Sequence, residues 1–144
     1  MSRPNPIDRS PTHLLHRAGQ SVADLFAKEI KSDLTPRQLT VLRAIAQNVG
    51  CSQSAIVERT GIDRSTIAEM VRRLVKKGII GRRRSRHDTR AYILTLTEAG
   101  QRLLKEAEPL AKHVDDKILR VLGGHGATFV GILAALIAQL EASS

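Results

Sequence analysis

Apolar side chains recur every three to five residues over much of the chain, which is the spacing of helices with one buried face. The first such stretch runs from about Ser10 to Lys31. Pro11 suits its first helical position because an N–H there would have no partner within the helix. Its apolar stripe consists of Leu15, Ala18, Val22, Leu25 and Ile30, with Phe26 beside it. The pattern predicts a long N-terminal helix after a flexible tail at residues 1–9.

The second stretch has the clearest helix start in the chain. Thr35 is placed to cap the helix, Pro36 occupies its first position, and Gln38 completes a capping box with Thr35. Gly50 is placed to end the helix in a left-handed conformation. We expect its buried face to consist of Leu39, Leu42, Ala46 and Val49.

Two shorter helices are predicted next, from Ser52 to Thr60 and from Asp63 to Lys77. The short turn between them contains Gly61, as the turn of a helix-turn-helix commonly does. In the second of these helices, the residues expected to face inward are Ile67, Met70, Val71, Leu74 and Val75. The outward face then carries Ser65, Glu69, Arg72, Arg73 and Lys76, with Arg64 and Thr66 near its N-terminal end.

Two strands follow, at residues 79–84 and 90–96. In the second strand, Tyr92, Leu94 and Leu96 alternate with the residues between them, which is the pattern of a half-buried strand. Residues 85–89 form the tip of the hairpin. A helix-turn-helix followed by a hairpin is a winged helix-turn-helix, which we place at residues 34–97.

The remaining chain predicts a long helix from Glu98 to Leu122 and a last helix from about Ala127 to Ala142. Pro109 lies inside the first of these and is expected to kink or break it. No charged residue occurs from Val121 to Leu140, but glycines interrupt this stretch and its dense apolar part is too short to span a membrane. We therefore expect residues 10–33 and 98–144 to form dimerisation helices. The fold class is mainly α with a small β-hairpin wing.

Charge is concentrated in the second half of the predicted winged helix. Residues 64–90 hold ten of the 23 Lys and Arg residues but only two of the 14 Asp and Glu residues. The whole chain has a formal net charge of +9. A basic stretch as local as this one is typical of a surface that binds a polyanion, most commonly a nucleic acid.

We predict double-stranded DNA as the partner of this basic surface. A merely solvated basic helix face and a basic hairpin that discourages edge-to-edge pairing are the alternatives. Against them, the basic face of the helix lies opposite the expected core and continues directly into the hairpin. The predicted DNA-binding residues are Ser52, Ser54, Arg64, Ser65, Thr66, Arg72, Arg73, Lys76, Arg86, His87, Asp88 and Arg90. Asp88 is expected to brace Arg86 or Arg90 rather than to contact DNA.

Other chemistry is poorly supported by the sequence. No pair of histidines has the spacing of four residues that would place two imidazoles on one helix face, so we expect no metal site and no cofactor. Cys51, the single cysteine, is interpreted as an ordinary thiol rather than a redox switch. We find no catalytic constellation and no phosphate-binding glycine loop, and we expect a DNA-binding protein of the cytoplasm rather than an enzyme.

Several strings resemble the MarR family of winged-helix transcriptional regulators. They are LTPRQLTVL from Leu34, DRSTIAEMVRRL from Asp63, KGIIGRR from Lys77, Asp88-Thr-Arg90, and LTLTEAG from Leu94. The Asp88-x-Arg90 pair together with the last string is the most specific part. The strong resemblance covers Leu34 to about Leu104.

The resemblance implies a homodimer whose terminal helices intertwine, with two DNA-binding lobes that contact a palindromic operator. It also implies that Arg90 enters the minor groove with support from Asp88. Many members of the family respond to small, often aromatic acids, so a repressor relieved by such a ligand is expected. The alternative is a general architectural or RNA-associated protein, but aromatic residues make up only 2% of the chain and offer few stacking platforms for single strands.

Overall fold

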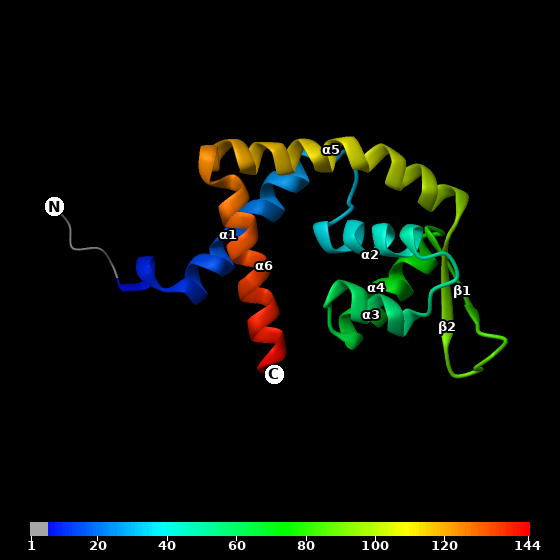
Figure 1. The fold of residues 1–144 in the computed structure, drawn as a ribbon. Helices are drawn as coiled ribbons and strands as arrows, with labels where there is room; N and C mark the ends of the chain where they lie inside the picture. Colours follow the sequence, from blue (N-terminus) through cyan, green and yellow to red (C-terminus); the bar gives the residue numbers. More distant parts are fainter. Residues whose placement is uncertain (1–5) are drawn as a thin grey trace.

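The computed structural model describes residues 6–144 and shows a mainly helical chain with one antiparallel hairpin (Figure 1). The mainly α fold class with a small hairpin is therefore confirmed. In chain order the elements are a 3-10 helix η1 (Pro6–Arg9), α1 (Pro11–Glu29), α2 (Pro36–Gln47), α3 (Gln53–Thr60), α4 (Arg64–Lys76), β1 (Ile80–Arg84), β2 (Tyr92–Leu96), α5 (Glu98–Leu122), η2 (Gly123–His125) and α6 (Gly126–Ala142).

One core joins the helix-turn-helix to the hairpin and to α5. Its most deeply buried side chains are Leu42, Ile56, Ile67, Ile80, Leu94, Val41 and Val71. Phe26 and Ile30 from the end of α1 belong to the same core, as do Ala107, Ala111 and Val114 from α5. The residues that the periodicity placed on the inner face of α4 are all buried or half-buried. Helix α5 lies over one side of this lobe, and α3, α4 and the hairpin tip lie toward the other (Figure 1).

Side-chain caps fix where the helices begin. Thr35 and Gln38 form the predicted capping box: the amide of Gln38 donates to Thr35 Oγ1 over 3.2 Å and the amide of Thr35 donates to Gln38 Oε1 over 3.0 Å. Ser52 caps α3 and Asp63 caps α4, as expected. Gly61 between them has φ of 67°, a left-handed conformation that glycine adopts without the cost of a Cβ.

The hairpin is tied to the helices at both of its ends. β1 and β2 pair in the register Ile80 with Leu96 through Arg84 with Tyr92. Ser52, just before α3, forms a further antiparallel bridge with Ile93. At the base of the hairpin, an added Cβ on Gly100 of α5 would lie 2.1 Å from the carbonyl oxygen of Ile79, so only glycine allows this close approach. The wing is thus attached to α3 and α5 as well as to α4.

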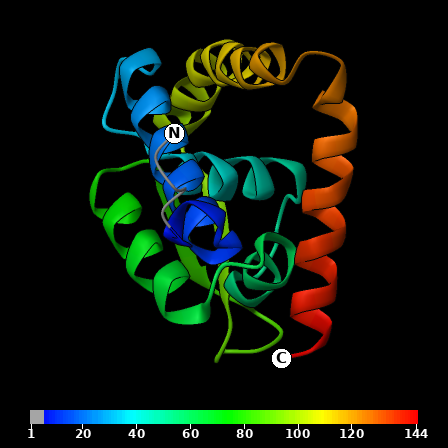
Figure 2. The ribbon, with the colours of Figure 1, turned by 90° about the vertical axis from the view of Figure 1, so that its left-hand side faces the viewer.

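Helix α5 runs through Pro109 as one continuous helix, so the break considered at that position is wrong. The proline is exposed, and its missing N–H costs only one bond of the ladder. Helix α6 then turns away from the end of α5 and runs beside the lobe (Figures 1 and 2). Near its C-terminal end, Glu141 Oε1 lies 3.1 Å from the position that a Cβ on Gly61 would occupy. Only Gly126 of α6 is buried. By length and composition, the helical stretch Glu98–Ala142 contains a segment apolar enough to cross a membrane, and 6% of that segment is buried within the chain.

Three expectations differ from the structure. Helix α2 ends at Gln47, so Val49 lies beyond it and is 94% exposed rather than buried, and Ala46 is also exposed. Residues Pro6–Arg9, predicted as part of a flexible tail, form a short 3-10 helix, while the rest of that tail, residues 1–5, lies outside the described residues. The strands begin at Ile80 and Tyr92, one and two residues later than predicted.

Candidate nucleic-acid interface

Helix α4 presents its basic side chains on the face opposite the core. Arg64, Ser65, Arg72, Arg73 and Lys76 are all exposed, whereas Ile67, Met70, Val71 and Leu74 of the same helix are buried. Thr66 is half-buried at the N-terminal end of the helix. The same helix thus contributes to the core and displays a charged surface, which is the arrangement of a helix that enters a groove of DNA.

The N-terminal end of α4 is held by Asp63. Its carboxylate accepts hydrogen bonds from the Thr66 hydroxyl at 2.7 Å, the Thr66 amide at 2.9 Å and the Ser65 hydroxyl at 2.8 Å. The Thr66 hydroxyl and amide, followed by the Ser65 hydroxyl, lower the pKa of Asp63 to about 2. With both protons donated to Asp63, the two hydroxyl oxygens remain available as acceptors.

Helix α3 adds two serines that the sequence placed in the interface. Ser54 is exposed and accepts a hydrogen bond from Arg64 Nη1 at 3.2 Å, so α3 and α4 share one polar surface. Ser52 is half-buried, and its hydroxyl accepts from the Ala55 amide at 3.1 Å. Ser52 therefore acts in the structure as a helix cap and as a bridge to the wing.

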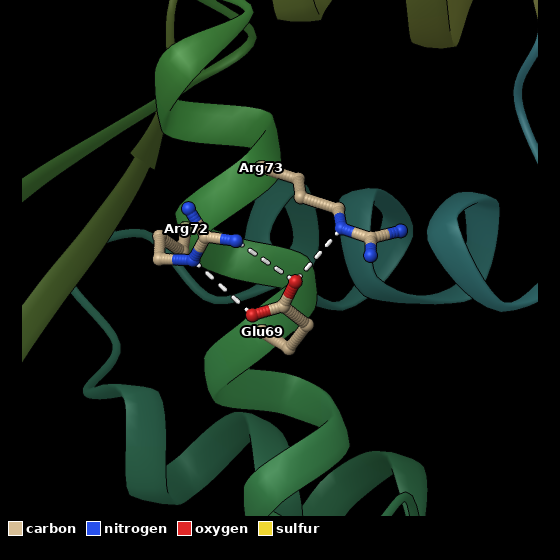
Figure 3. Close-up of polar contacts among 3 residues, drawn as sticks. All are labelled: Glu69, Arg72 and Arg73. Carbon is tan, nitrogen blue, oxygen red and sulfur yellow. Dashed lines mark hydrogen bonds and ion pairs between the residues drawn. The ribbon is translucent and has the colours of Figure 1, made fainter.

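In the middle of the α4 surface, one carboxylate holds two arginines (Figure 3). Glu69 Oε1 accepts from Arg72 Nη2 and from Arg73 Nε, both at 2.9 Å, and Glu69 Oε2 accepts from Arg72 Nε at 3.1 Å. Hydrogen bonds from Arg72 and then Arg73 lower the pKa of Glu69. The sequence placed these residues on one face, but it did not predict that they bind one another.

The wing carries a second basic cluster, built around an aromatic ring. The guanidinium carbons of Arg82 and Arg84 lie 4.4 Å and 4.6 Å from the centre of the Tyr92 ring. Both distances are within the range of a cation–π interaction. Arg84 Nη1 also donates to the carbonyl oxygen of Thr89 at 2.8 Å and so steadies the tip. This role of Tyr92 was missed, although its position opposite Arg84 was a signal that could have revealed it.

The wing tip exposes Arg86, His87, Asp88 and Arg90. Asp88 does brace its neighbour, but through the backbone: Asp88 Oδ1 accepts from the amide of Arg90 at 3.0 Å. The Arg90 guanidinium is exposed at the edge of the hairpin. The predicted site residues therefore lie in two groups, one on α3 and α4 and one at the wing tip.

The His, Cys and acidic side chains outside this basic surface give little support to a metal site or a reactive thiol. Residues 6–144 contain no group of three His, Cys, Asp or Glu side chains close enough to hold a metal ion. Burial raises the pKa of the Cys51 thiol, which disfavours the reactive thiolate. His113 Nε2 lies 3.9 Å from Glu29, which is already paired with Lys117 between α1 and α5. Glu29, His113 and Lys117 therefore join α1 to α5.

An apolar pocket of about 450 Å³ opens between the end of α2, strand β2 and the start of α5. The exposed Val49 lies at its edge, together with Ala46, so the apolar side chains that failed to join the core line this pocket. Thr95 and Gln101 supply its polar groups. The pocket is large enough for a small organic molecule.

Comparison with known proteins gives one consistent result. The sequence profile of the MarR family matches residues 32–91. The transcriptional regulator HosA of Escherichia coli O111:H- is 36% identical over 92 residues, which cover 64% of this chain and 68% of that protein.

Two solved structures are similar over nearly the whole chain. The PcaV transcriptional regulator of Streptomyces coelicolor, in complex with its natural ligand, superposes with a TM-score of 0.85 at 29% identity and covers 96% of this chain and 98% of its own. The transcriptional repressor CouR, bound to a 23-mer DNA duplex, superposes with a TM-score of 0.81 at 29% identity and covers 96% of this chain and 99% of its own.

Proposed function

The chain belongs to the MarR family of transcriptional regulators, and we propose that it acts as a homodimeric repressor that binds a palindromic operator. In this proposal α4 lies in the major groove and the wing follows the adjacent backbone, with Arg90 in the minor groove. The observation that carries the proposal is the position of the basic side chains. Those of α4 and the wing are exposed on one lobe, whereas Ile67, Met70, Val71 and Leu74 on the other face of α4 are buried.

The two basic groups would make different kinds of contact. The α4 arginines can donate two parallel hydrogen bonds to a guanine edge in the major groove. An arginine at the edge of the wing suits a narrow minor groove, where negative potential is concentrated. The structure of CouR with a DNA duplex supports a DNA-binding role for a chain of this fold.

The proposed dimer follows from the exposed apolar side chains of the terminal helices. Leu14 and Leu15 of α1 are exposed, as are Leu119 and Val121 of α5. Helix α6 adds Phe129, Val130, Ile132, Leu136, Ile137 and Leu140. Exposed apolar side chains in this number are typical of an interface. A second copy would cover it and place two α4 helices on one face of the assembly, and the protein would act in the cytoplasm.

A small-molecule effector is the remaining part of the proposal. PcaV has been solved with its natural ligand, and CouR with p-coumaroyl-CoA, which supports a ligand of small aromatic-acid type. We place the site between the dimerisation helices and the DNA-binding lobe. The pocket beside Val49 borders both α5 and the wing, so a molecule bound there would bias the position of the wing.

Selection from a random duplex library tests the proposed function. The 144-residue chain should enrich a palindromic sequence and bind it at least about 1,000-fold more tightly than a scrambled duplex at the same salt concentration. Equal binding to duplex and single-stranded probes, without enrichment, would instead indicate the general nucleic-acid-binding alternative. Effector binding is tested by adding aromatic acids and their thioesters to the enriched complex, where an effector must release DNA and must itself bind more weakly when DNA is present.

A further inference from the structure

Glu69 is the acidic residue of the exposed α4 surface, and it lies at the centre of that surface rather than at its edge. Its two oxygens take up three N–H donors from Arg72 and Arg73, at 2.9 to 3.1 Å (Figure 3). The arrangement leaves the Glu69 side chain 47% exposed, with Arg72 at 60% and Arg73 at 66%. These three side chains form a charged cluster that faces solvent.

The fold does not need this cluster. Ion pairs between exposed residues three or four apart on a helix stabilise it by only a few tenths of a kcal/mol. Asp63 already caps the N-terminus of α4, and the inner face is secured by buried apolar residues. A carboxylate in the middle of a surface that approaches phosphates also lowers the affinity for DNA in general. Glu69 therefore has a role that stability does not explain.

The hydrogen bonds from Arg72 and Arg73 to Glu69 determine how readily the two arginines can contact DNA. The Glu69 carboxylate reduces the net charge of the cluster from two positive charges to one, and its hydrogen bonds hold both guanidinium groups against it. Releasing Arg72 leaves Glu69 Oε2 without an arginine donor, next to a polyanion, which is unfavourable, whereas releasing Arg73 leaves Oε1 with its bond from Arg72. The release is compensated only where the groove offers a donor to that carboxylate. In the major groove such donors are the exocyclic amino groups, and cytosine N4 is the usual partner of a glutamate.

We propose that Glu69 is a specificity-determining residue that accepts a hydrogen bond from a cytosine amino group in the major groove. On sequences without that amino group, Glu69 keeps Arg72 and Arg73 bound to itself and so weakens non-specific binding. This inference rests on the proposed function, because it requires α4 to lie in the major groove.

The test compares the wild-type chain with Glu69→Gln and with Glu106→Gln. Glu106 is exposed on α5, so its variant removes the same charge away from the α4 surface. Each protein is used for selection from a random duplex library and is titrated with one scrambled duplex at several salt concentrations. Circular dichroism and thermal unfolding verify that both variants keep the fold.

The expected result has two parts. Wild type and Glu106→Gln should fix a cytosine in each half-site, whereas Glu69→Gln should prefer adenine there, because glutamine pairs with adenine, by about 5- to 100-fold. On the scrambled duplex, Glu69→Gln should bind several-fold more tightly, and its log–log salt slope should be steeper by about 1, because one more phosphate is neutralised. Glu106→Gln should leave both quantities at their wild-type values.

Enrichment of the same sequences by wild type and Glu69→Gln, with equal salt slopes, would overturn this inference and leave the proposed function intact. Tighter scrambled-duplex binding by Glu106→Gln to the same degree as by Glu69→Gln would also overturn it, because net charge alone would then explain the gain. Failure of the wild-type protein to enrich any duplex would overturn the proposed function, and this inference with it.

Discussion

Helices α4 and α6 divide their side chains in opposite ways. Helix α4 buries its apolar face in the core of its own chain and exposes its basic face to solvent. Helix α6 is apolar around most of its circumference, yet Gly126 is its only buried residue. In Figure 2, α6 runs beside the lobe that contains α4 and approaches it through Glu141 near its C-terminal end. The apolar face of α4 is buried within its own chain, whereas the apolar side chains of α6 remain largely exposed.

The two parts of the molecule should therefore respond differently to substitution. In the lobe, stability comes from contacts inside the chain, so substitutions there should act on folding without regard to protein concentration. In α6 the apolar surface becomes useful only against another molecule, so substitutions there should act on assembly and depend on concentration.

The largest effect is expected for the double substitution Leu133→Asp and Leu136→Asp in α6. If a second copy covers these leucines, the four side chains of a dimer lose burial worth on the order of 6 kcal/mol, and new charges enter the interface. Sedimentation velocity should show a monomer at micromolar concentration, with operator binding lost in parallel. Gln139→Asp in the same helix is the matched control. A folded wild-type monomer at that concentration would contradict the dimer.

The next effect concerns the core of the lobe. Leu94 on β2 is fully buried, and Leu94→Ala should lower the free energy of unfolding by about 2–5 kcal/mol because it leaves a cavity. Val49 is 94% exposed, and Val49→Ala should change it by less than about 0.5 kcal/mol. Chemical denaturation of the two variants measures the difference. Similar losses for both would mean that Val49 is covered in solution.

A smaller effect separates the two basic groups of the lobe. Arg90→Ala should cost about 1–3 kcal/mol of specific binding, mainly where the sequence beside the half-site is rich in A·T pairs. Lys76→Ala should weaken binding to all sequences about equally and flatten the salt dependence. Titration against an operator and a scrambled duplex compares the two variants. Equal losses on both duplexes for Arg90→Ala would restrict the wing to backbone contacts.

The smallest effect is a pH dependence of stability from the cap of α4. The pKa of Asp63 is lowered from 3.8 to about 2, so the charged form is favoured by folding. Its contribution to stability is present above pH 3.8 and is lost as the pH falls toward 2. Asparagine also caps helices but does not titrate, so the unfolding midpoint of Asp63→Asn should fall less over this interval. Parallel pH profiles would contradict the assignment.

Local features of the sequence predicted most of the fold. The capping box at Thr35 and Gln38, the turn at Gly61 and the cap at Asp63 involve residues within a few positions of one another, and the structure confirms each of them. The inner face of α4 also follows from its own periodicity, because burial of a helix repeats along the helix.

Features that depend on distant residues were missed or misplaced. Val49 continues the apolar spacing of α2, but the helix ends at Gln47, and this depends on how the chain turns into Cys51. The bridge between Ser52 and Ile93 joins residues far apart in the sequence, and no local pattern indicates it. The candidate interface shows the same limit. The periodicity of α4 predicted that Glu69 lies on the exposed face, but its hydrogen bonds with Arg72 and Arg73 depend on side-chain rotamers, which the sequence pattern does not specify.

Helix α5 gives the molecule a fixed internal length. Its 25 residues run without a break from the wing to the turn before α6, a span of ~37 Å at 1.5 Å per residue. One end is locked to the hairpin, where Gly100 lies against Ile79 and the Thr97 hydroxyl donates to the Gly78 carbonyl oxygen at 2.6 Å. In a dimer joined through α6, the fixed length of the two α5 helices would set the distance between the two DNA-binding lobes. The spacing of operator half-sites would then be a property of helix geometry, and a one-residue insertion in α5 would rotate each lobe by roughly 100° and abolish recognition without touching a DNA contact.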